Sequence, residues 1–581
     1  MAVQENDWVA RLADEVIDDV VRRRGSLEGY TITCASGLSP SGPIHLGNLR
    51  EVMVPHLVAD EITRRGIPCE HIISWDDYDR YRKVPFGVDG VDASWSAHIG
   101  KPLTSVPAPP GSAYDSWAAH FRAAMEASLA QLGVKYRGIS QTQMYTSGAY
   151  RESVLHAMAC RNDIDAVLGQ YRTKVEPPAA TSSSRSPELQ DQAAVEAAEG
   201  SGAAGEDDGS AEGAEYFPFR PYSRAFGTDA TRVTAYDPET TTVTYVATGP
   251  DGDQVVETMR LDTDTHGKLV WKVDWPMRWA FEGVDFEPSG VDHQSPGSSW
   301  VVGKDLAPIF GAQRPVGPMY AFVGIAGMAK MSSSKGGVPT PADALAIMEP
   351  HVLRWLYARR KPNQSFTVAF NNEIHRLYDE WDALERKIAG GKGQPADNAI
   401  HARSVRTATA DLPRTAVTVP YKALCSVVDI TGGNVEQIGR ILTSIDASIT
   451  DLDVARPRLD LATTWLETQA DPEDRTVVRS TPDTATLAGL SEHQRQALAM
   501  LAADLDANWS LDGLTSLVYG IPKRQAGFDV TEKKLPPEVK ADQRAFFALL
   551  YQLLLGTDTG PRIPTLLLCV GAQRVRALIG A

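Results

Sequence analysis

Cysteine is scarce in this chain of 581 residues. Five occur, and no two lie close together in the sequence: Cys34, Cys69, Cys160, Cys425 and Cys569. This scatter argues against a disulfide framework and a zinc ribbon, and it favours a reducing compartment.

Long apolar runs are also missing. The longest, from Phe546 to Leu555, is interrupted by a glutamine and is far too short to span a bilayer. Glu5, Asp7 and Arg11 precede any apolar run at the N-terminus, so we expect no secretory signal. The sequence therefore predicts a cytoplasmic protein without a membrane partner.

Positive charge is in deficit: 57 Lys and Arg residues face 74 Asp and Glu residues, a formal net charge of −17. Much of the excess lies between residues 176 and 215, where ten acidic residues accompany a single arginine. Small residues and proline fill most other positions there, so the segment cannot bury enough apolar surface to offset the entropy of ordering. We predict a disordered acidic insertion over 176–215. An acidic tail that imitates nucleic acid is the alternative.

The first hundred residues predict the start of an α/β fold. A buried strand over 30–35 is followed by a glycine and proline loop over 36–43, a helix over 44–65 and a second strand over 71–75. In such a β-α-β unit a ligand lies beyond the carboxyl end of the strand, at the N-terminus of the helix.

The remaining patterns divide the chain further. Residues 231–246 alternate as an antiparallel strand pair does, and apolar residues from Ile374 to Ile388 keep a helical period that stops at Gly390. The predicted order is the first half of an α/β domain (1–175), the acidic insertion (176–215), a β-rich inserted subdomain (216–265), the second half of the α/β domain (266–369) and a helical domain (370–581).

The loop from Gly37 to Asn48 is suited to binding a polyphosphate. Its glycines allow tight turns and close approach of a ligand, while the free amides of the following helix favour anions. His45 and Asn48 lie three residues apart, so both project from the first helical turn toward such a ligand. The alternative is a glycine loop with a core histidine.

A second loop, from Gly327 to Gly337, carries Lys330 among serines. Glycines at both ends suit a mobile lid that places the lysine ammonium on a leaving diphosphate. Taken alone, such a segment is more often a solvated linker.

Together the two loops resemble the "HIGH" and "KMSKS" motifs of class I aminoacyl-tRNA synthetases, with Asn48 at the second histidine and Ser333 at the second lysine. Further segments, 74–83, 267–279 and 289–293, resemble the class I lysyl-tRNA synthetase family. The resemblance is dense from about Trp8 to Phe370.

This resemblance implies a Rossmann-type catalytic domain with an inserted connective region and an all-α C-terminal domain that reads the tRNA anticodon. It implies ligation of L-lysine to tRNA(Lys) through lysyl-adenylate, with ATP and its Mg²⁺ as one substrate complex. A monomer is favoured.

The resemblance also implies roles for individual residues. The catalytic residues are His45, Asn48 and Lys330. The residues that contact ATP are Pro40, Ser41, Gly42, His45, Gly47, Asn48, Lys330, Met331, Ser332, Ser333 and Ser334. The residues that contact lysine are Gly37, Ser39, Asp76, Asp77, Trp271, Trp275 and His293.

Purely structural roles are the alternative for several of these residues. The tryptophans could be core residues, and Asp76 or Asp79 could pair with Arg80 or Arg82. Rival functions are a synthetase for glutamate or glutamine, which the aspartates at 76 and 77 disfavour by charge repulsion, and a paralogue that binds tRNA or a small ligand without charging it.

Two further expectations concern metal and tRNA. Related proteins often hold zinc with cysteine pairs in the inserted region, but segments 221–226 and 245–250 contain no cysteine, so we predict no bound zinc. A basic run, Arg354, Arg359, Arg360 and Lys361, predicts contact with the tRNA acceptor arm.

Overall fold

The computed structural model describes residues 7–172, 215–264, 266–295, 297–326, 338–471 and 475–581. Nearly all of the predicted acidic insertion therefore lies outside the described residues. The same holds for Lys330, Met331, Ser332, Ser333 and Ser334 of the second loop. The chain divides into two compact units, unit 1 (Met1–Leu345, Pro350–Val368 and Lys392–Leu412) and unit 2 (Ala346–Glu349, Ala369–Gly391 and Pro413–Ala581).

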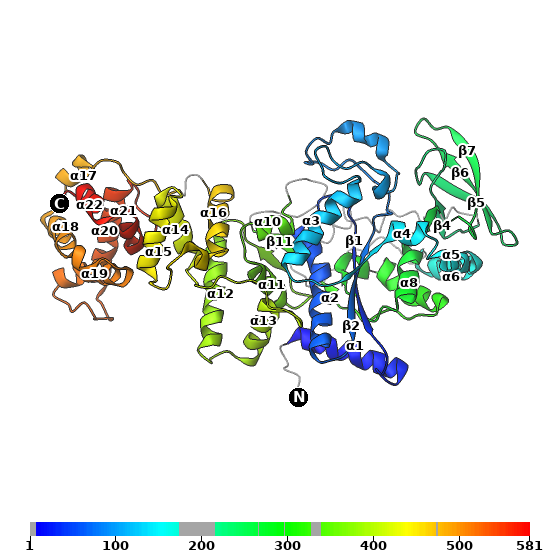
Figure 1. Ribbon diagram of the computed structural model, residues 1–581, viewed down its shortest axis with the longest axis horizontal. Helices are drawn as coiled ribbons and strands as arrows, with labels where there is room; N and C mark the ends of the chain where they lie inside the picture. The colour runs from blue at the N-terminus through cyan, green and yellow to red at the C-terminus, as the bar shows by residue number, and fades with distance from the viewer. Residues whose placement is uncertain (1–6, 173–214, 265, 296, 327–337, 472–474) are drawn as a thin grey trace, which may run out of the picture. The chain divides into compact units, whose positions relative to one another are not determined.

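Unit 1 is an α/β structure built on a parallel sheet (Figure 1). Its first elements are α1 (Trp8–Arg24), β1 (Ile32–Leu38), α2 (Leu46–Arg64), β2 (Cys69–Trp75), α3 (Trp117–Gln131), β3 (Arg137–Ser140), α4 (Gln141–Thr146), α5 (Arg151–Ala159) and α6 (Arg161–Arg172). β2 pairs in parallel with β1 on one side and with β3 on the other, which confirms the predicted β-α-β unit.

The first strand is longer than predicted. Ser36, Gly37 and Leu38 belong to β1 rather than to the loop, because Gly37 pairs with Ser74 and Leu38 with Trp75 of β2. None of the motif's three glycines has a positive φ among the described residues. Gly37 lies in β1 and Gly47 in α2, so neither makes the predicted tight turn, whereas Gly42 lies in a bend of the chain. What the motif provides is a strand that brings Gly37 to the sheet's carboxyl edge.

The second half of unit 1 extends the sheet and covers it. Its elements are β8 (Gly267–Leu269), α8 (Trp271–Glu282), β9 (Ser289–Gly290), a 3-10 turn (Val291–Gln294), α9 (Ser299–Leu306), β10 (Met319–Tyr320), β11 (Val323–Ile325), α10 (Pro341–Leu345), α11 (Pro350–Ala358), β12 (Phe366–Val368) and α13 (Pro395–Val405). Phe286 forms parallel bridges with Cys34 of β1 and with Val316.

Side chains on one face of the sheet form a core with α8 and α9. The cluster comprises Ala35, Ile72, Ile139, Trp275, Trp279, Val284, Trp300 and Ala307. Neighbouring residues of β1 and β2 point to the opposite face, where Ser36 donates its hydroxyl to the Glu51 carbonyl of α2 at 3.1 Å. The sheet is thus covered on both faces, as the near-continuous burial of β1 requires.

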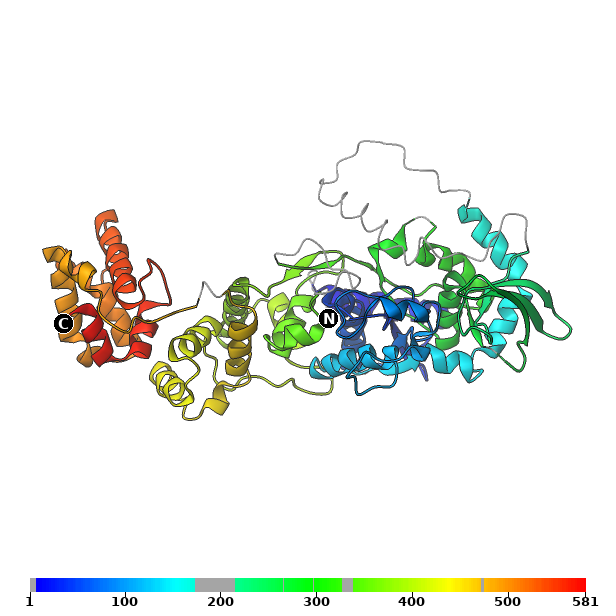
Figure 2. The same ribbon diagram turned by 90° about the horizontal axis from the view of Figure 1, so that it is seen from above.

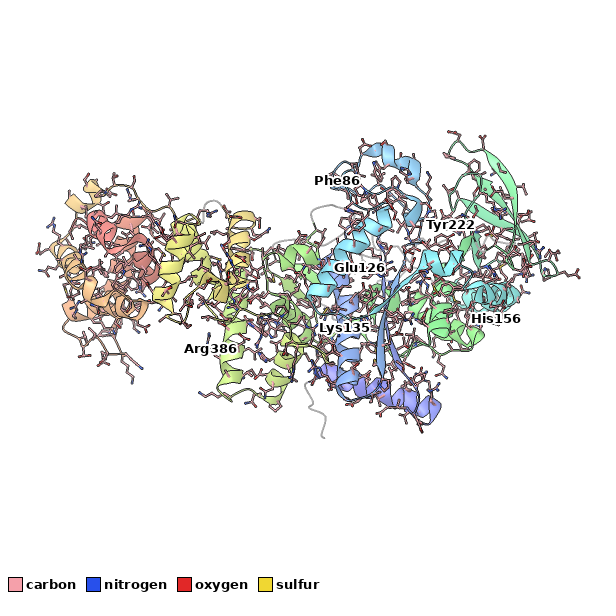
Figure 3. All side chains as sticks on the ribbon, in the orientation of Figure 1. Phe86, Glu126, Lys135, His156, Tyr222 and Arg386 are labelled. Carbon is pink, nitrogen blue, oxygen red and sulfur yellow. The ribbon has the colours of Figure 1, made fainter. Side chains whose placement is uncertain are left out.

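Between the two halves lies an antiparallel insertion. It consists of β4 (Phe219–Pro221), which pairs with β8, and a sheet of β5 (Thr231–Asp237), β6 (Thr242–Thr248) and β7 (Gln254–Arg260), seen from a second side in Figure 2. Tyr222, labelled in Figure 3, donates its hydroxyl to the Tyr78 carbonyl at 2.6 Å. This bond ties the insertion to the segment after β2.

Unit 2 is helical. It contains α12 (Glu373–Ala389), α14 (Tyr421–Thr431), α15 (Val435–Ile445), α16 (Arg458–Thr468), α17 (Thr484–Ala488), α18 (Glu492–Asp504), α19 (Leu511–Gln525), α20 (Pro537–Leu554), α21 (Ile563–Val570) and α22 (Ala572–Ile579). The helix predicted from Ile374 to Ile388 is confirmed as α12. Buried Arg458 pairs with Glu349 and with Asp382, each at 2.8 Å. In the described part of the chain, no helix has both the length and the apolar character needed to cross a bilayer.

Candidate active site

The side chains of His45 and Asn48 form a reciprocal cap at the N-terminus of α2. The Gly47 amide donates to His45 Nδ1 at 3.1 Å, and the His45 amide donates to Asn48 Oδ1 at 3.3 Å. This reciprocal cap fixes both side chains in the first turn, as their spacing predicts.

The cap also determines which imidazole nitrogen carries the proton. Because Nδ1 of His45 accepts a hydrogen bond, the neutral ring holds its proton on Nε2. Burial lowers the pKa of His45 to about 4, so the ring is neutral at pH 7. His45 is therefore a neutral hydrogen-bond donor at the helix N-terminus, a group that stabilises developing negative charge without a change of protonation.

The loop before α2 is held from the side. Trp117 of α3 donates its indole N–H to the Ser41 carbonyl at 3.0 Å, while the Ser41 side chain stays exposed. A methyl group added at Gly42 would meet no atom within 4 Å. Pro40, Ser41 and Gly42 thus form a fixed rim beside His45, in which Ser41 is exposed and Pro40 and Gly42 are buried.

A central cavity of about 210 Å³ lies at the carboxyl ends of β1 and β2. Of the residues predicted from sequence, it is lined by Gly37, Ser39, Asn48, Asp76, Trp271, Trp275 and His293. The cavity is also lined by residues that the sequence did not single out: Glu51, Ser74, Gln141, Tyr150, Arg278, Glu282, Glu287 and Ser289. All but one of the residues predicted to contact lysine therefore line the central cavity.

The exception is Asp77, whose carboxylate fixes the β3–α4 junction instead. It accepts hydrogen bonds from the Thr142 amide at 2.8 Å and the Ser140 hydroxyl at 2.6 Å. Its side chain is buried but does not line the cavity.

We expect Asp77→Ala to lower the free energy of unfolding by roughly 0.5–2 kcal/mol, the usual cost of losing a helix-capping acceptor. The affinity for lysine, the ligand that the resemblance implies, should change little. Urea denaturation and calorimetric titration measure the two effects. A tenfold loss of that affinity without loss of stability would instead place Asp77 in the binding site.

One wall of the cavity carries a buried ion network. Arg278 of α8 donates to Asp76 Oδ1 at 2.6 Å and to Ser74 Oγ at 3.1 Å, and it also pairs with Asp274 one helical turn earlier. Burial raises the pKa of Asp76 to about 6, while Arg278 opposes that rise. The alternative left open from the sequence, that Asp76 or Asp79 pairs with Arg80 or Arg82, does not describe Asp76, because Arg278 reaches it from α8; Asp79 pairs with Lys268.

Aromatic rings line the cavity next to this network, with the Arg278 guanidinium 5.4 Å from the centroid of the Trp271 ring. Trp271 stacks on Trp275 with ring centroids 5.2 Å apart, and His293 meets Trp275 edge-on at 5.5 Å. Indole faces pack well against methylene groups and attract cations.

Glu287 is the most unusual group that sequence reasoning missed. Its side chain is 6% exposed, lines the central cavity and accepts a hydrogen bond from Trp279 Nε1 at 2.6 Å. Burial raises its pKa to about 7. The local sequence signal is weak, a single acid shortly before the Ser289–Gly290 segment that the resemblance had already marked.

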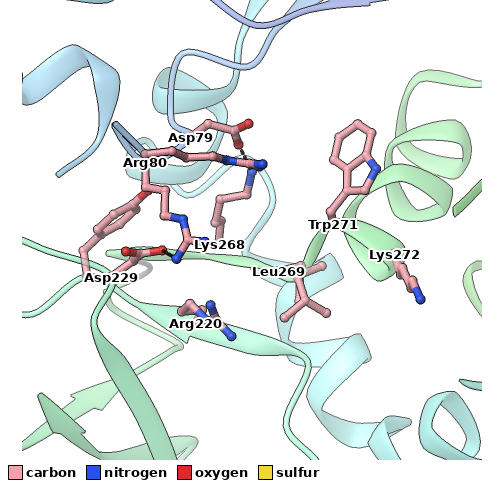
Figure 4. A pocket seen from close by; sticks show the side chains of 11 residues that line it. Asp79, Arg80, Arg220, Asp229, Lys268, Leu269, Trp271 and Lys272 are labelled. Atoms are coloured by element: carbon pink, nitrogen blue, oxygen red, sulfur yellow. Dashed lines mark hydrogen bonds and ion pairs between the residues drawn. The ribbon is translucent and has the colours of Figure 1, made fainter. Parts of the chain in front are cut away.

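A smaller basic cavity of about 70 Å³ shares Trp271 with the central cavity. Five basic side chains line it, Arg80, Arg82, Arg220, Lys268 and Lys272, against two acidic ones, Asp79 and Asp229. Figure 4 shows the pairs Lys268–Asp79, at 2.5 Å, and Arg80–Asp229, at 3.4 Å. The surplus of positive charge favours an anionic ligand.

The predicted tRNA-binding run contains an error. Arg354 is fully buried and donates to His56 Nε2 at 2.9 Å and to the Leu132 carbonyl at 2.8 Å. It therefore connects elements of unit 1 and offers no charge to a nucleic acid.

Metal ligands do not gather in the described part of the chain. No group of three or more His, Cys, Asp or Glu side chains there is placed to hold a metal ion. The absence of zinc stays a prediction from the missing cysteines.

The sequence is similar to proteins of one family over most of its length. The family model for class I tRNA synthetases (K) matches residues 6–411. A lysine–tRNA ligase of Streptomyces coelicolor is 61% identical over 583 residues, covering 100% of this chain and 99% of the relative. Lysine–tRNA ligases of Pyrococcus furiosus and Treponema pallidum are 30% and 27% identical, each covering at least 97% of both chains.

Proposed function

We propose that this chain, which belongs to the family of class I tRNA synthetases (K) and is an aminoacyl-tRNA synthetase, ligates L-lysine to tRNA(Lys). The observation that carries the proposal is full-length similarity, 61% identity, to a lysine–tRNA ligase. The central cavity agrees with it, because carboxylates and indole faces suit a long cationic side chain. The alternative of a non-charging paralogue is not favoured.

In the proposed reaction the lysine carboxylate attacks the α-phosphate of ATP, forming lysyl-adenylate and releasing diphosphate. A terminal ribose hydroxyl of the tRNA then attacks the lysyl carbonyl, and AMP leaves. Mg²⁺ accompanies ATP and is coordinated mainly by its phosphates. The unit 1 fold is proposed to be of the Rossmann type, with ATP at the N-terminus of α2.

His45 and Asn48 are the proposed catalytic donors of this chain. Pro40, Ser41, Gly42 and Gly47 would contact ATP along the rim that Trp117 holds. By sequence alone, Lys330 with Met331, Ser332, Ser333 and Ser334 would contact the phosphates from the other side. These assignments rest on the motif positions and on the cap geometry of α2.

Lysine is proposed to occupy the central cavity. Gly37 and Ser39 would contact its α-amino and carboxylate end, while Trp271, Trp275 and His293 would enclose its methylenes. Unit 2 would read the anticodon, and the enzyme would act in the cytoplasm as a monomer.

The basic cavity is proposed to receive the terminal phosphates of the tRNA, because it adjoins the central cavity through Trp271. Lys272 of α8 lines it (Figure 4). We expect Lys272→Ala to raise the KM for tRNA about threefold to tenfold, the effect of one lost phosphate contact, with the KM for lysine unchanged. Lys304→Ala, an exposed lysine of α9 outside both cavities, is the matched control. Equal tRNA kinetics in the two variants would contradict this role.

The proposed function is tested by aminoacylation of total tRNA with each of the twenty amino acids in turn. We expect lysine alone to be attached. Attachment of another amino acid, or of none, would refute the proposal.

A further inference from the structure

The segment that carries Glu287 lies between β1 and the segment at Val316, because Phe286 bridges to both. The Ala35 amide donates to the Phe286 carbonyl at 2.7 Å, and the Glu287 amide donates to the Val316 carbonyl at 3.0 Å. A methyl group added at Gly317 would lie 1.9 Å from the Glu287 carbonyl oxygen, so only glycine allows this approach. Glu287 therefore projects from a rigid backbone.

The Glu287 carboxylate is held by a neutral donor. The indole N–H group of Trp279 donates to it at 2.6 Å. Within the described residues it forms no ion pair within 4.0 Å. A buried carboxylate without a cation is costly, since desolvation of the charge is not repaid.

Two other carboxylates of the central cavity, Asp76 and Glu282, differ in this respect. Asp76 is already paired with Arg278 at 2.6 Å, and Glu282 is paired with Arg137 at 3.0 Å. A cation bound by Asp76 would face the Arg278 guanidinium as a like charge. A cation bound by Glu287 would meet no such like charge at hydrogen-bond distance, because the donor to Glu287 is a neutral indole.

We propose that the Glu287 carboxylate pairs with the side-chain ammonium of the substrate lysine and so sets selectivity for lysine over uncharged analogues. The inference rests on the proposed function and names the residue that makes this cavity selective. The ammonium supplies the missing countercharge, and the neighbouring indole faces attract it as well. Binding then turns an uncompensated buried acid into a hydrogen-bonded ion pair.

A proton should leave as lysine binds. Because the pKa of free Glu287 is raised to about 7, the acid is partly protonated at neutral pH, whereas pairing with an ammonium requires the carboxylate. The other charged or titratable groups of the cavity are Arg278 and Glu282 of α8, Asp76, Glu51, Tyr150 and His293. Of these, Arg278 lowers the pKa of Glu287 and Asp76 raises it.

The sign of the pH effect follows. Below pH 7 the protonated acid must lose its proton to bind lysine, so affinity falls as pH falls. We expect the KM for lysine to rise about tenfold from pH 8 to pH 6 in the wild-type enzyme. Calorimetric titration of the tRNA-bound enzyme with L-lysine at pH 7, in buffers of different ionisation enthalpy, should show release of about half a proton.

The mutational test is Glu287→Gln. We expect its KM for lysine to rise roughly 10- to 100-fold, the usual loss when a hydrogen bond to a charged group is removed. Discrimination against norleucine, which lacks only the ammonium, should fall by the same factor, and the pH dependence between 6 and 8 should flatten. Glu126→Gln is the matched control, because Glu126 (Figure 3) bonds Arg122 on α3 and lies outside the cavity.

Unchanged norleucine discrimination in Glu287→Gln overturns the inference. If that variant does not fold, the wild-type titration decides, and a pH-independent lysine KM without proton release overturns the inference. Failure of the proposed function looks different, because the wild-type enzyme would then not attach lysine at all.

Discussion

Replacing His45 by alanine is expected to slow lysyl-adenylate formation by roughly 10²- to 10³-fold, with little change in the KM for lysine. The reason lies in the cap of α2, which holds Nδ1 on the Gly47 amide and leaves Nε2–H as a donor. A donor aimed at the developing charge on the α-phosphate acts mainly in the transition state, so its loss lowers kcat.

Two variants separate this effect from loss of the helix cap. His45→Asn keeps a side chain that caps helices well but lacks the reach of the imidazole, so we expect it to be slow as well. His120→Ala removes a histidine of α3 that lies outside the central cavity and serves as the control. The rate is followed by ATP–diphosphate exchange in the presence of tRNA. ATP–diphosphate exchange at the wild-type rate in His45→Ala would show that His45 is not a catalytic residue.

The wild-type exchange rate should not follow the ionisation of His45 between pH 6 and 8. Burial lowers the pKa of His45 to about 4, so the ring stays neutral over this range. Ionisation of Glu287, by contrast, should change the KM for lysine over the same pH range. The pH dependence of the KM therefore reports on Glu287, and the exchange rate at saturating lysine reports on His45.

The second large effect is expected for Arg278→Leu. This change leaves Asp76 and Asp274 buried without their shared guanidinium, and removal of one partner from a buried ion pair costs about 3–5 kcal/mol. Lys268, 3.8 Å from Asp274, compensates only in part. We expect a corresponding loss in the free energy of unfolding of unit 1 and loss of lysine binding.

Chemical denaturation measures this loss. Arg22→Leu, which breaks an exposed pair with Asp19 on α1, should cost less than about 1 kcal/mol and serves as the control. Similar denaturation curves for the two leucine variants would show that the Asp76–Arg278–Asp274 network does not stabilise the fold.

Local sequence patterns predicted the parts of the fold that depend on local chemistry. The β-α-β unit, the His45–Asn48 turn and α12 follow from residue spacing and capping. The convergence of Gly37, Trp275 and His293 on one cavity was expected from family resemblance, because no local pattern joins residues more than two hundred positions apart.

The errors have a common physical origin. Arg354 looked like part of a basic surface, but charge in a sequence does not reveal burial, and its partners come from three distant segments. The structural alternative for Asp76 named a neighbouring arginine, whereas its partner lies 202 residues away. Glu287 was missed because its place beside β1 depends on strand pairing.

The most direct test of the account is a crystal structure of the enzyme with tRNA and a non-hydrolysable analogue of lysyl-adenylate. We predict that the lysyl methylenes lie against Trp275 with the ammonium on the Glu287 carboxylate, and that the adenylate phosphate lies beside His45 at the start of α2. Density for the lysyl group outside the central cavity would contradict it.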